Sequence, residues 1–156
     1  MDKYGNRFIS VLKNCNIEYN IDDDVIVIYI AASKEDEKGI NEVVYQTDEV
    51  FAFEVAFELD IEEEKLAILY EYINNVNCNL LKTKFVYDVD SKTIEVRHYL
   101  DKSDNLDDDM YIYNTLLPIM IYIKYGEFVD DIIEKRYTPA EVIEMINRRD
   151  MENNIE

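Results

Sequence analysis

Glycine and proline are scarce in this chain, with 3 and 2 copies in 156 residues. A phosphate-binding loop needs several glycines close together, whereas Gly5, Gly39 and Gly126 lie far apart. A glycine-rich nucleotide loop is therefore excluded. The same scarcity argues against a loop-rich chain or an all-β sandwich, and it favours regular helices and strands.

Cysteine and histidine are also rare, with Cys15, Cys78 and His98 as the full set. They are too few and too far apart to close a four-ligand zinc site. The N-terminal stretch MDKYGNRFISVLKN has no apolar signal-peptide core, so we expect reduced thiols and a cytoplasmic protein. The longest apolar run covers residues 116–123 and is too short to cross a bilayer.

Basic residues are outnumbered: 16 Lys and Arg stand against 35 Asp and Glu, which gives a net charge of −19. Such a surface repels phosphate backbones and anionic membranes, so we expect neither nucleic-acid nor membrane binding. The charge is compatible with solubility alone, with a basic protein partner, or with mimicry of nucleic acid. Apolar residues make up 48% of the chain, so we expect one domain with a buried core.

Five strands are predicted from β-branched runs and alternation, at residues 25–32, 42–47, 50–59, 84–88 and 93–100, with a charged turn at 34–39. In the third strand, one face carries the large apolar residues Phe51, Phe53, Val55, Phe57 and Leu59, and we expect helices to cover it. The opposite face carries Ala52, Glu54, Ala56 and Glu58.

Four helices are predicted from apolar spacing and capping patterns, at residues 4–15, from Asp60 to about Asn77, from about Asp107 onward, and from Thr138 onward. Pro118 is expected to kink the third helix or to mark its start. That helix is apolar on two sides, and its apolar surface is larger than one face of a sheet can bury. The surplus suggests a dimer interface or a peptide groove. We expect the tail from Arg148 to fray.

The element order predicts an α+β domain. We expect an antiparallel five-stranded sheet, in the order α-β-β-β-α-β-β-α, packed by helices and followed by an extra C-terminal helix. Residues 1–137 form the domain in this interpretation, and residues 138–156 are a helical extension of it.

Catalytic and metal sites are not predicted. Cys78, His98 and an asparagine are formally the inventory of a thiol protease. However, His98 alternates with apolar residues of its strand, and a lone histidine in that place is more often a residue with satisfied hydrogen bonds or an interface residue than a catalytic base. The acidic runs at 22–24 and 107–109 lack EF-hand spacing, and a helix N-terminus explains the second. No cofactor is predicted, and a thiol enzyme at Cys78 remains an alternative.

The stretch Asn74-Asn75-Val76-Asn77-Cys78-Asn79 is interpreted as a helix-to-strand junction. Asparagine tolerates the left-handed conformation, so we expect Asn77 to end the helix. We also expect the side chains of Asn74 and Asn77 to bond the backbone of residues 78–82.

Three segments carry a resemblance to a known family: INNVN at 73–77, FVYDVD at 85–90 and IEVR at 94–97. Over residues 4–130 the chain resembles the YbjN family, in which a helix ends in a similar asparagine pattern before a hairpin whose strand ends in a basic residue. The resemblance implies the type III secretion chaperone-like fold. Secretion chaperones of that fold are small, acidic and usually dimeric, and they hold an extended segment of a partner protein. Leu81-Lys82-Thr83 and Ser91 stand where the family favours glycine.

The leading hypothesis is a non-enzymatic protein-binding domain, a chaperone-like or regulatory adaptor that forms a homodimer. Its expected partner-binding residues are Ala52, Glu54, Ala56, Glu58, Tyr122 and Tyr125. The partner is expected to be a polypeptide that adds to an exposed strand or lies along an apolar patch. The second hypothesis is an acidic inhibitor or immunity-type protein that neutralises a basic toxin or enzyme.

Overall fold

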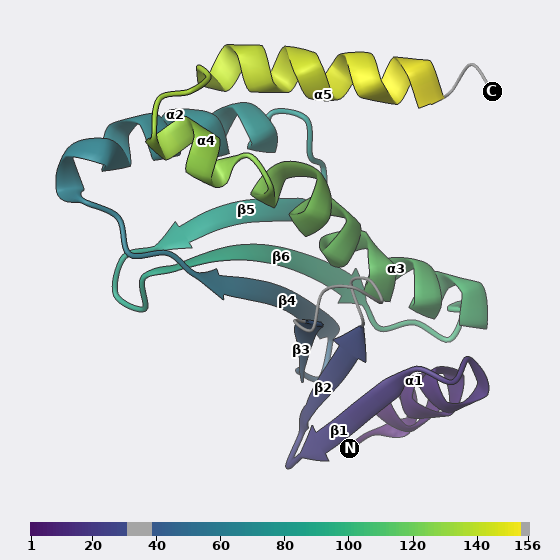
Figure 1. Ribbon diagram of the computed structural model, residues 1–156. Helices are drawn as coiled ribbons and strands as arrows, with labels where there is room; N and C mark the ends of the chain where they lie inside the picture. The colour runs from purple at the N-terminus through teal and green to yellow at the C-terminus, as the bar shows by residue number, and fades with distance from the viewer. Residues whose placement is uncertain (31–38, 154–156) are drawn as a thin grey trace.

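Helices cover one face of a single antiparallel sheet in the computed structural model, which describes residues 1–30 and 39–153 (Figure 1). The strands are β1 (Glu18–Asp22), β2 (Val25–Ile30), β3 (Ile40–Gln46), β4 (Val50–Glu58), β5 (Thr83–Asp88) and β6 (Thr93–Asp101). Their spatial order is β1-β2-β3-β4-β6-β5. The helical elements are α1 (Lys3–Asn14), η1 (Glu63–Lys65), α2 (Leu66–Asn77), α3 (Asp108–Ile121), η2 (Tyr122–Gly126), α4 (Val129–Ile133) and α5 (Pro139–Asn153).

The sheet has six strands, so the predicted number of five is wrong. The missed strand, β1, has the sequence EYNID, and asparagine and aspartate are depleted in strands. It lies at the edge of the sheet and pairs with β2 across a two-residue turn, in which Asp23 has a φ of 52°. The end of the predicted strand at 31–32 and most of the predicted charged turn, 34–38, lie outside the described residues.

The alternation predicted for β4 is confirmed. Phe51, Phe53 and Val55 are buried beneath the helices, and β4 joins two clusters of the core. One cluster packs α1 and α3 on β2, β3 and β4, and it contains Phe8, Ile26, Phe53 and Tyr111. The other packs α2, η2, α4 and α5 on β4, β5 and β6. The C-terminal helix contributes Val142 and Ile146 to this second cluster.

Helix boundaries follow the capping residues only in part. Asp107 caps α3 by accepting the Met110 amide at 2.8 Å, and Thr138 and Glu141 form the predicted capping box of α5. The predicted cap at Asp60 is wrong, because a 3₁₀ turn precedes α2 and Asp60 instead pairs with Lys92 at 2.8 Å.

Two further expectations about helix ends need correction. Pro118 does not mark the start of α3, because it lies inside that helix, which passes into the π-helical turn η2 after Ile121. The expected fraying is also wrong for residues 148–153, since α5 extends to Asn153; residues 154–156 lie outside the described part of the chain.

α2 ends at Asn77, as predicted, and Cys78 after it has right-handed geometry. Asn77 does not have the predicted left-handed conformation. Its side chain instead reaches β5. The Asn77 amide nitrogen donates to the Phe85 carbonyl at 2.9 Å, and its oxygen accepts the Phe85 backbone N–H at 2.8 Å. The predicted bonds to residues 78–82 are therefore wrong for Asn77. Because β5 is the last strand of the sheet, the Asn77 amide occupies the place of a further strand.

Replacing Asn77 with alanine is expected to lower the free energy of unfolding by about 1–3 kcal/mol, because both polar groups of Phe85 lose their partner. Asn74→Ala is the matched control, since Asn74 is exposed one turn earlier on the same helix. Urea denaturation measures both variants. Equal losses in the two would show that the contact between Asn77 and Phe85 is not important for stability.

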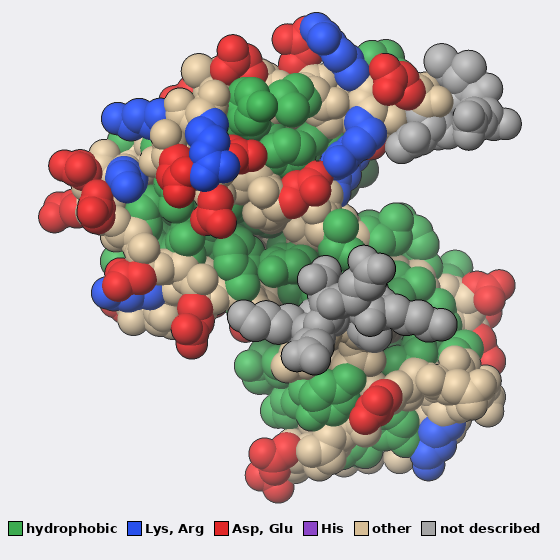
Figure 2. All heavy atoms as spheres, in the orientation of Figure 1, with side chains coloured by type: hydrophobic (Ala, Val, Ile, Leu, Met, Phe, Trp, Pro, Cys, Tyr) green, Lys and Arg blue, Asp and Glu red, His purple; other side chains and the backbone are tan. Residues whose placement is uncertain are grey.

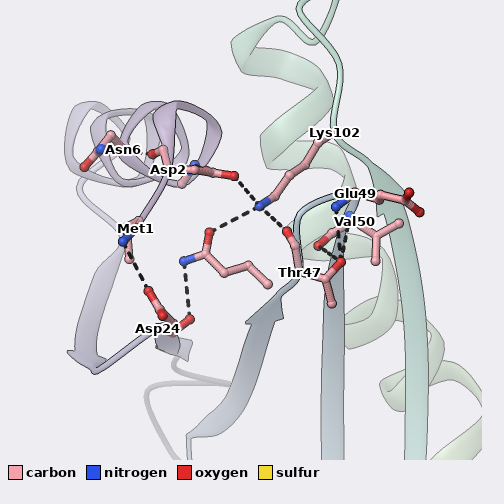
Figure 3. A network of polar contacts seen from close by, with 10 residues as sticks. Met1, Asp2, Asn6, Asp24, Thr47, Glu49, Val50 and Lys102 are labelled. Atoms are coloured by element: carbon pink, nitrogen blue, oxygen red, sulfur yellow. Dashed lines mark hydrogen bonds and ion pairs between the residues drawn. The ribbon is translucent and has the colours of Figure 1, made fainter.

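Lys102, just beyond β6, ties the start of α1 to the β3–β4 turn (Figure 3). Its side chain is only 2% exposed, and its ammonium lies 2.7 Å from an Asp2 carboxylate oxygen. It also donates to the Thr47 carbonyl and lies 4.9 Å from the centre of the Phe51 ring. Partial burial by itself raises the pKa of Asp2, but hydrogen bonds from Lys102 and the Gly5 amide outweigh it and hold the pKa below its ordinary value.

Candidate functional site

One side of α3 exposes large apolar residues to solvent. The opposite side of α3 is buried against the sheet through Tyr111, Thr115 and Ile119. Five large apolar residues instead face solvent, and we call them the α3 face: Met110, Tyr113, Leu116, Met120 and Ile123. Met120 is 59% exposed and Tyr113 is 61% exposed. Figure 2 shows hydrophobic side chains gathered over α3.

The sequence explains why this side of α3 is unusual. No residue from Met110 to Ile123 carries a charge, although one third of the whole chain is charged. The members of the α3 face recur every three or four residues, so they form one stripe along the helix. Exposed apolar stripes of this kind mark sites of protein interaction. The sequence predicted an apolar surplus in this helix, and the structure identifies the residues that carry it.

Two hollows border the α3 face and extend it. One, of about 420 Å³, is lined by the loop before β5 and by His98 and Asn114; it includes Leu81, which is 96% exposed. The other, of about 480 Å³, lies between the end of α3 and α5, where Lys124, Glu127 and Arg149 form its polar edge. Figure 2 shows the molecule hollowed between α5 and α3.

His98 fixes α3 against the sheet. Its Nδ1 lies 3.0 Å from the Thr83 hydroxyl, and its Nε2 lies 2.7 Å from the Asn114 Oδ1. Since the Asn114 Nδ2 donates to the Met110 carbonyl, its Oδ1 accepts, and Nε2 of His98 carries the proton. Burial lowers the pKa of His98, so the ring is neutral at pH 7. Both ring nitrogens are engaged, which agrees with a satisfied structural histidine and leaves neither to act as a base for Cys78.

The expected partner-binding residues do not form one site. Ala52, Glu54, Ala56 and Glu58 point away from the helices, on the face of the sheet that carries none of the helices in Figure 1. Tyr122 is half-buried, with its ring edge-on to Phe57 at 5.1 Å between centroids. Tyr125 is only 5% exposed and belongs to the core, so its expected place on the surface is wrong. The π-helical turn η2 directs its side chain inward, and its carbonyl accepts the buried Tyr72 hydroxyl at 2.7 Å.

Glu42 is a buried acid on the helix-facing side of β3. Its residue exposure is 0%, and neither carboxylate oxygen has a hydrogen-bond partner in the part of the chain that the structure describes. Its cross-strand neighbours are Ile28 and Val55. Burial disfavours the charged form and raises the pKa of Glu42 well above its ordinary value.

Glu42→Met is expected to raise the free energy of unfolding by about 1–3 kcal/mol at pH 8, because it replaces a buried carboxyl group with an apolar side chain of similar volume. The pKa of Glu42 is near 4.5 in the unfolded chain and higher in the folded chain, so Glu42 costs no stability below pH 4.5. The free energy of unfolding falls as the pH rises from 4.5 through the pKa of the folded state. The gain should therefore grow with pH across this window. Urea denaturation between pH 4 and 8 measures it, with the exposed Glu63→Met as control. A gain independent of pH would contradict this account.

Comparison with known proteins identifies the fold. No family model and no curated protein matches the sequence. Among solved structures, the chain is similar to YbjN from E. coli, described as a candidate transcription regulator, with a TM-score of 0.57 and 10% identity over 84% of this chain and 90% of that one. It is also similar to an uncharacterized protein from Methanothermobacter thermautotrophicus, with a TM-score of 0.54 and 10% identity over 86% of this chain and 99% of that one. The chain therefore has a YbjN-like α+β fold, as the sequence resemblance implied. Within residues 1–30 and 39–153, no helix is long and apolar enough to cross a membrane.

Proposed function

We propose that this chain is a non-enzymatic protein-binding domain, a chaperone-like or regulatory adaptor that works as a homodimer. The uncharged α3 face carries the proposal, because on a chain of net charge −19 it can meet another protein without burying carboxylates. The YbjN-like fold is compatible with this role, and the type III secretion chaperone-like resemblance implies it.

A second copy of the chain is the occupant that the α3 face suits best. Most of the surface of a second copy repels this one, since both are strongly acidic. Two α3 faces can meet with apolar side chains on both sides, and a two-fold axis makes such a surface self-complementary.

The ends of α3 favour an antiparallel pairing. Its first turn carries Asp108 and Asp109, and Lys124 lies just beyond its last turn. In an antiparallel pair, the acidic first turn of one α3 lies beside Lys124 of the other. The helix dipoles also oppose one another in this arrangement. A parallel pair would instead bring four carboxylates together.

Sedimentation equilibrium of the chain at micromolar concentration tests the proposal. We expect a particle of twice the mass of one chain, and we expect the dimer to persist in 0.5 M salt because the contact is mainly apolar. A monomer at all concentrations would refute the homodimer. A dimer that dissociates at high salt would show that charged surfaces form the contact.

A further inference from the structure

The face of the sheet opposite the helices combines aromatic rings with uncompensated negative charge. It is formed by the strand residues that point away from the helices, and we call it the open sheet face. Its exposed aromatic residues are Tyr29, Tyr45 and Tyr99, which are 40%, 44% and 47% exposed. Tyrosine combines a large apolar ring with a polar hydroxyl and is enriched on surfaces that bind other proteins.

Ala52 lies at the centre of this aromatic surface. It is paired with Tyr45 on β3 and with Tyr99 on β6, so a tyrosine stands on either side of it. Strands in a sheet are spaced by about 5 Å, which places the two tyrosine backbones roughly 10 Å apart. The alanine side chain between them is short, so the two tyrosine side chains extend further from the sheet than Ala52 does. A long side chain placed over Ala52 would lie between the two tyrosines.

The negative charge on the open sheet face exceeds its positive charge. Along β4, β5 and β6 it carries the carboxylates of Glu54, Glu58, Asp88, Glu95 and Asp101, against two cations, Lys84 and Arg97. Arg97 pairs with Glu95 and lies 3.6 Å from Glu54. Both carboxylate oxygens of Glu95 have partners: Oε2 pairs with Arg97, and Oε1 accepts the Thr93 hydroxyl at 2.8 Å. Partial burial and the charge of Glu95 raise the pKa of Glu54, and Arg97 does not offset them. A further cation placed here would therefore be stabilised.

We propose that the open sheet face binds an extended, lysine- and arginine-rich segment of a partner polypeptide. The inference rests on the proposed function, and it names the class of partner. A nucleic acid has flat rings to stack on the tyrosines, but its phosphates would be repelled by the carboxylates. A basic polypeptide places cations both on the carboxylates and over the tyrosine rings.

The spacing of β4 explains why the segment is extended. Ala52, Glu54, Ala56 and Glu58 alternate small and acidic side chains along one face, two residues apart. The side chains of an extended chain that point to one side recur with the same period, about 6.7 Å. Successive cationic side chains of such a segment can enter beside the alanines and reach Glu54 and Glu58. The carboxylates of Glu54 and Glu58 are thus the specific contacts, and Tyr45 and Tyr99 are the aromatic contacts.

The test uses the full chain and a labelled 12-residue peptide of alternating arginine and threonine, titrated by fluorescence anisotropy. We expect saturable binding that weakens at least tenfold between 50 and 300 mM salt. Glu54→Gln/Glu58→Gln should raise the Kd at least tenfold, and Tyr45→Ala/Tyr99→Ala should raise it about tenfold. A peptide of alternating glutamate and threonine should not bind.

Matched controls separate a site from general attraction to an acidic protein. Glu63→Gln/Glu64→Gln removes the same charge from the exposed η1, and Tyr137→Ala removes a tyrosine that is 40% exposed before α5. Neither should change the Kd. Equal losses in the test and control variants would overturn the proposal, as would the absence of binding. A change in the sedimentation of the unliganded Tyr45→Ala/Tyr99→Ala variant would show that the face contacts a second copy instead, which also overturns it.

Failure of this inference can be told apart from failure of the proposed homodimer. The open sheet face and the α3 face lie on different surfaces, so peptide binding should survive substitutions in α3, and dimerisation should survive substitutions at Glu54 and Glu58. Peptide binding by a monomeric chain would support the open sheet face while contradicting the homodimer.

Discussion

Leu116→Glu combined with Met120→Glu is expected to raise the dissociation constant of the homodimer at least a thousandfold. Both residues belong to the exposed α3 face, and Met120 is 59% exposed, so neither substitution disturbs the core of one chain. In the dimer each glutamate would be buried against an apolar surface, and burying an unpaired carboxylate costs several kcal/mol of binding free energy. Because the interface is two-fold symmetric, every substitution is present twice. Sedimentation velocity over a range of concentrations measures the change.

The control adds the same charge elsewhere. Val89→Glu combined with Met151→Glu replaces two apolar residues that are 56% and 60% exposed and lie in the β5–β6 turn and in α5. This variant should remain dimeric, since its added charge lies outside the α3 face. If both double variants dissociate to the same extent, overall repulsion between acidic chains governs assembly, and the α3 face is not the interface.

Lys102→Met is expected to lower the free energy of unfolding by about 2–4 kcal/mol, the largest loss of stability that we expect from one substitution. The substitution keeps the length of the side chain and removes a buried cation. Asp2, Gln46 and the Thr47 carbonyl then lose a shared partner, which loosens the start of α1 from the β3–β4 turn. Urea denaturation at pH 7 measures the loss, and it should be accompanied by faster hydrogen exchange in α1.

Lys3→Met is the matched control for this prediction. Lys3 also forms an ion pair at 2.7 Å, with Asp104, but both side chains are largely exposed. An exposed pair gains little because water solvates both partners well in the unfolded chain. We therefore expect no measurable change. A loss as large as that of Lys102→Met would mean that burial is not what makes Lys102 important.

The parts of the fold that could be predicted are those where one physical signal dominates. Strict alternation in β4 determines which face meets the helices, and the capping box at Thr138 determines where α5 begins. β1 was missed because it is short and contains Asn20 and Asp22, residue types that are depleted in strands, and its pairing with β2 comes from the turn at Asp23. At Asn77 the sequence indicated a junction, but the partner is in another element. A long-range hydrogen bond of this kind leaves no periodic trace in the sequence.

The candidate sites show a similar division. The uncharged run from Met110 to Ile123 is visible in the sequence, whereas its division into a buried and an exposed side depends on how α3 rests on the sheet. Tyr125 was placed on the surface because spacing assumes a regular helix, while η2 is π-helical. Ala52 lies between Tyr45 and Tyr99 because β4 pairs with β6 and not with β5. This arrangement can be recognised only when the order of the strands in the sheet is known. Sequence patterns predict faces of single elements, and the sheet order decides which faces combine.

Disulfide cross-linking along α3 tests the central claim, that the α3 face is the contact between two copies in an antiparallel pair. In a chain with Cys15→Ser and Cys78→Ser, Leu116→Cys lies near the middle of the stripe, and Met110→Cys lies at one end. Under mild oxidation we predict a covalent dimer for Leu116→Cys alone and little for Met110→Cys alone. A mixture of Met110→Cys and Ile123→Cys chains should cross-link to each other. Efficient cross-linking of Met110→Cys to itself would contradict the antiparallel arrangement, and no cross-link at any of the three positions would contradict the interface.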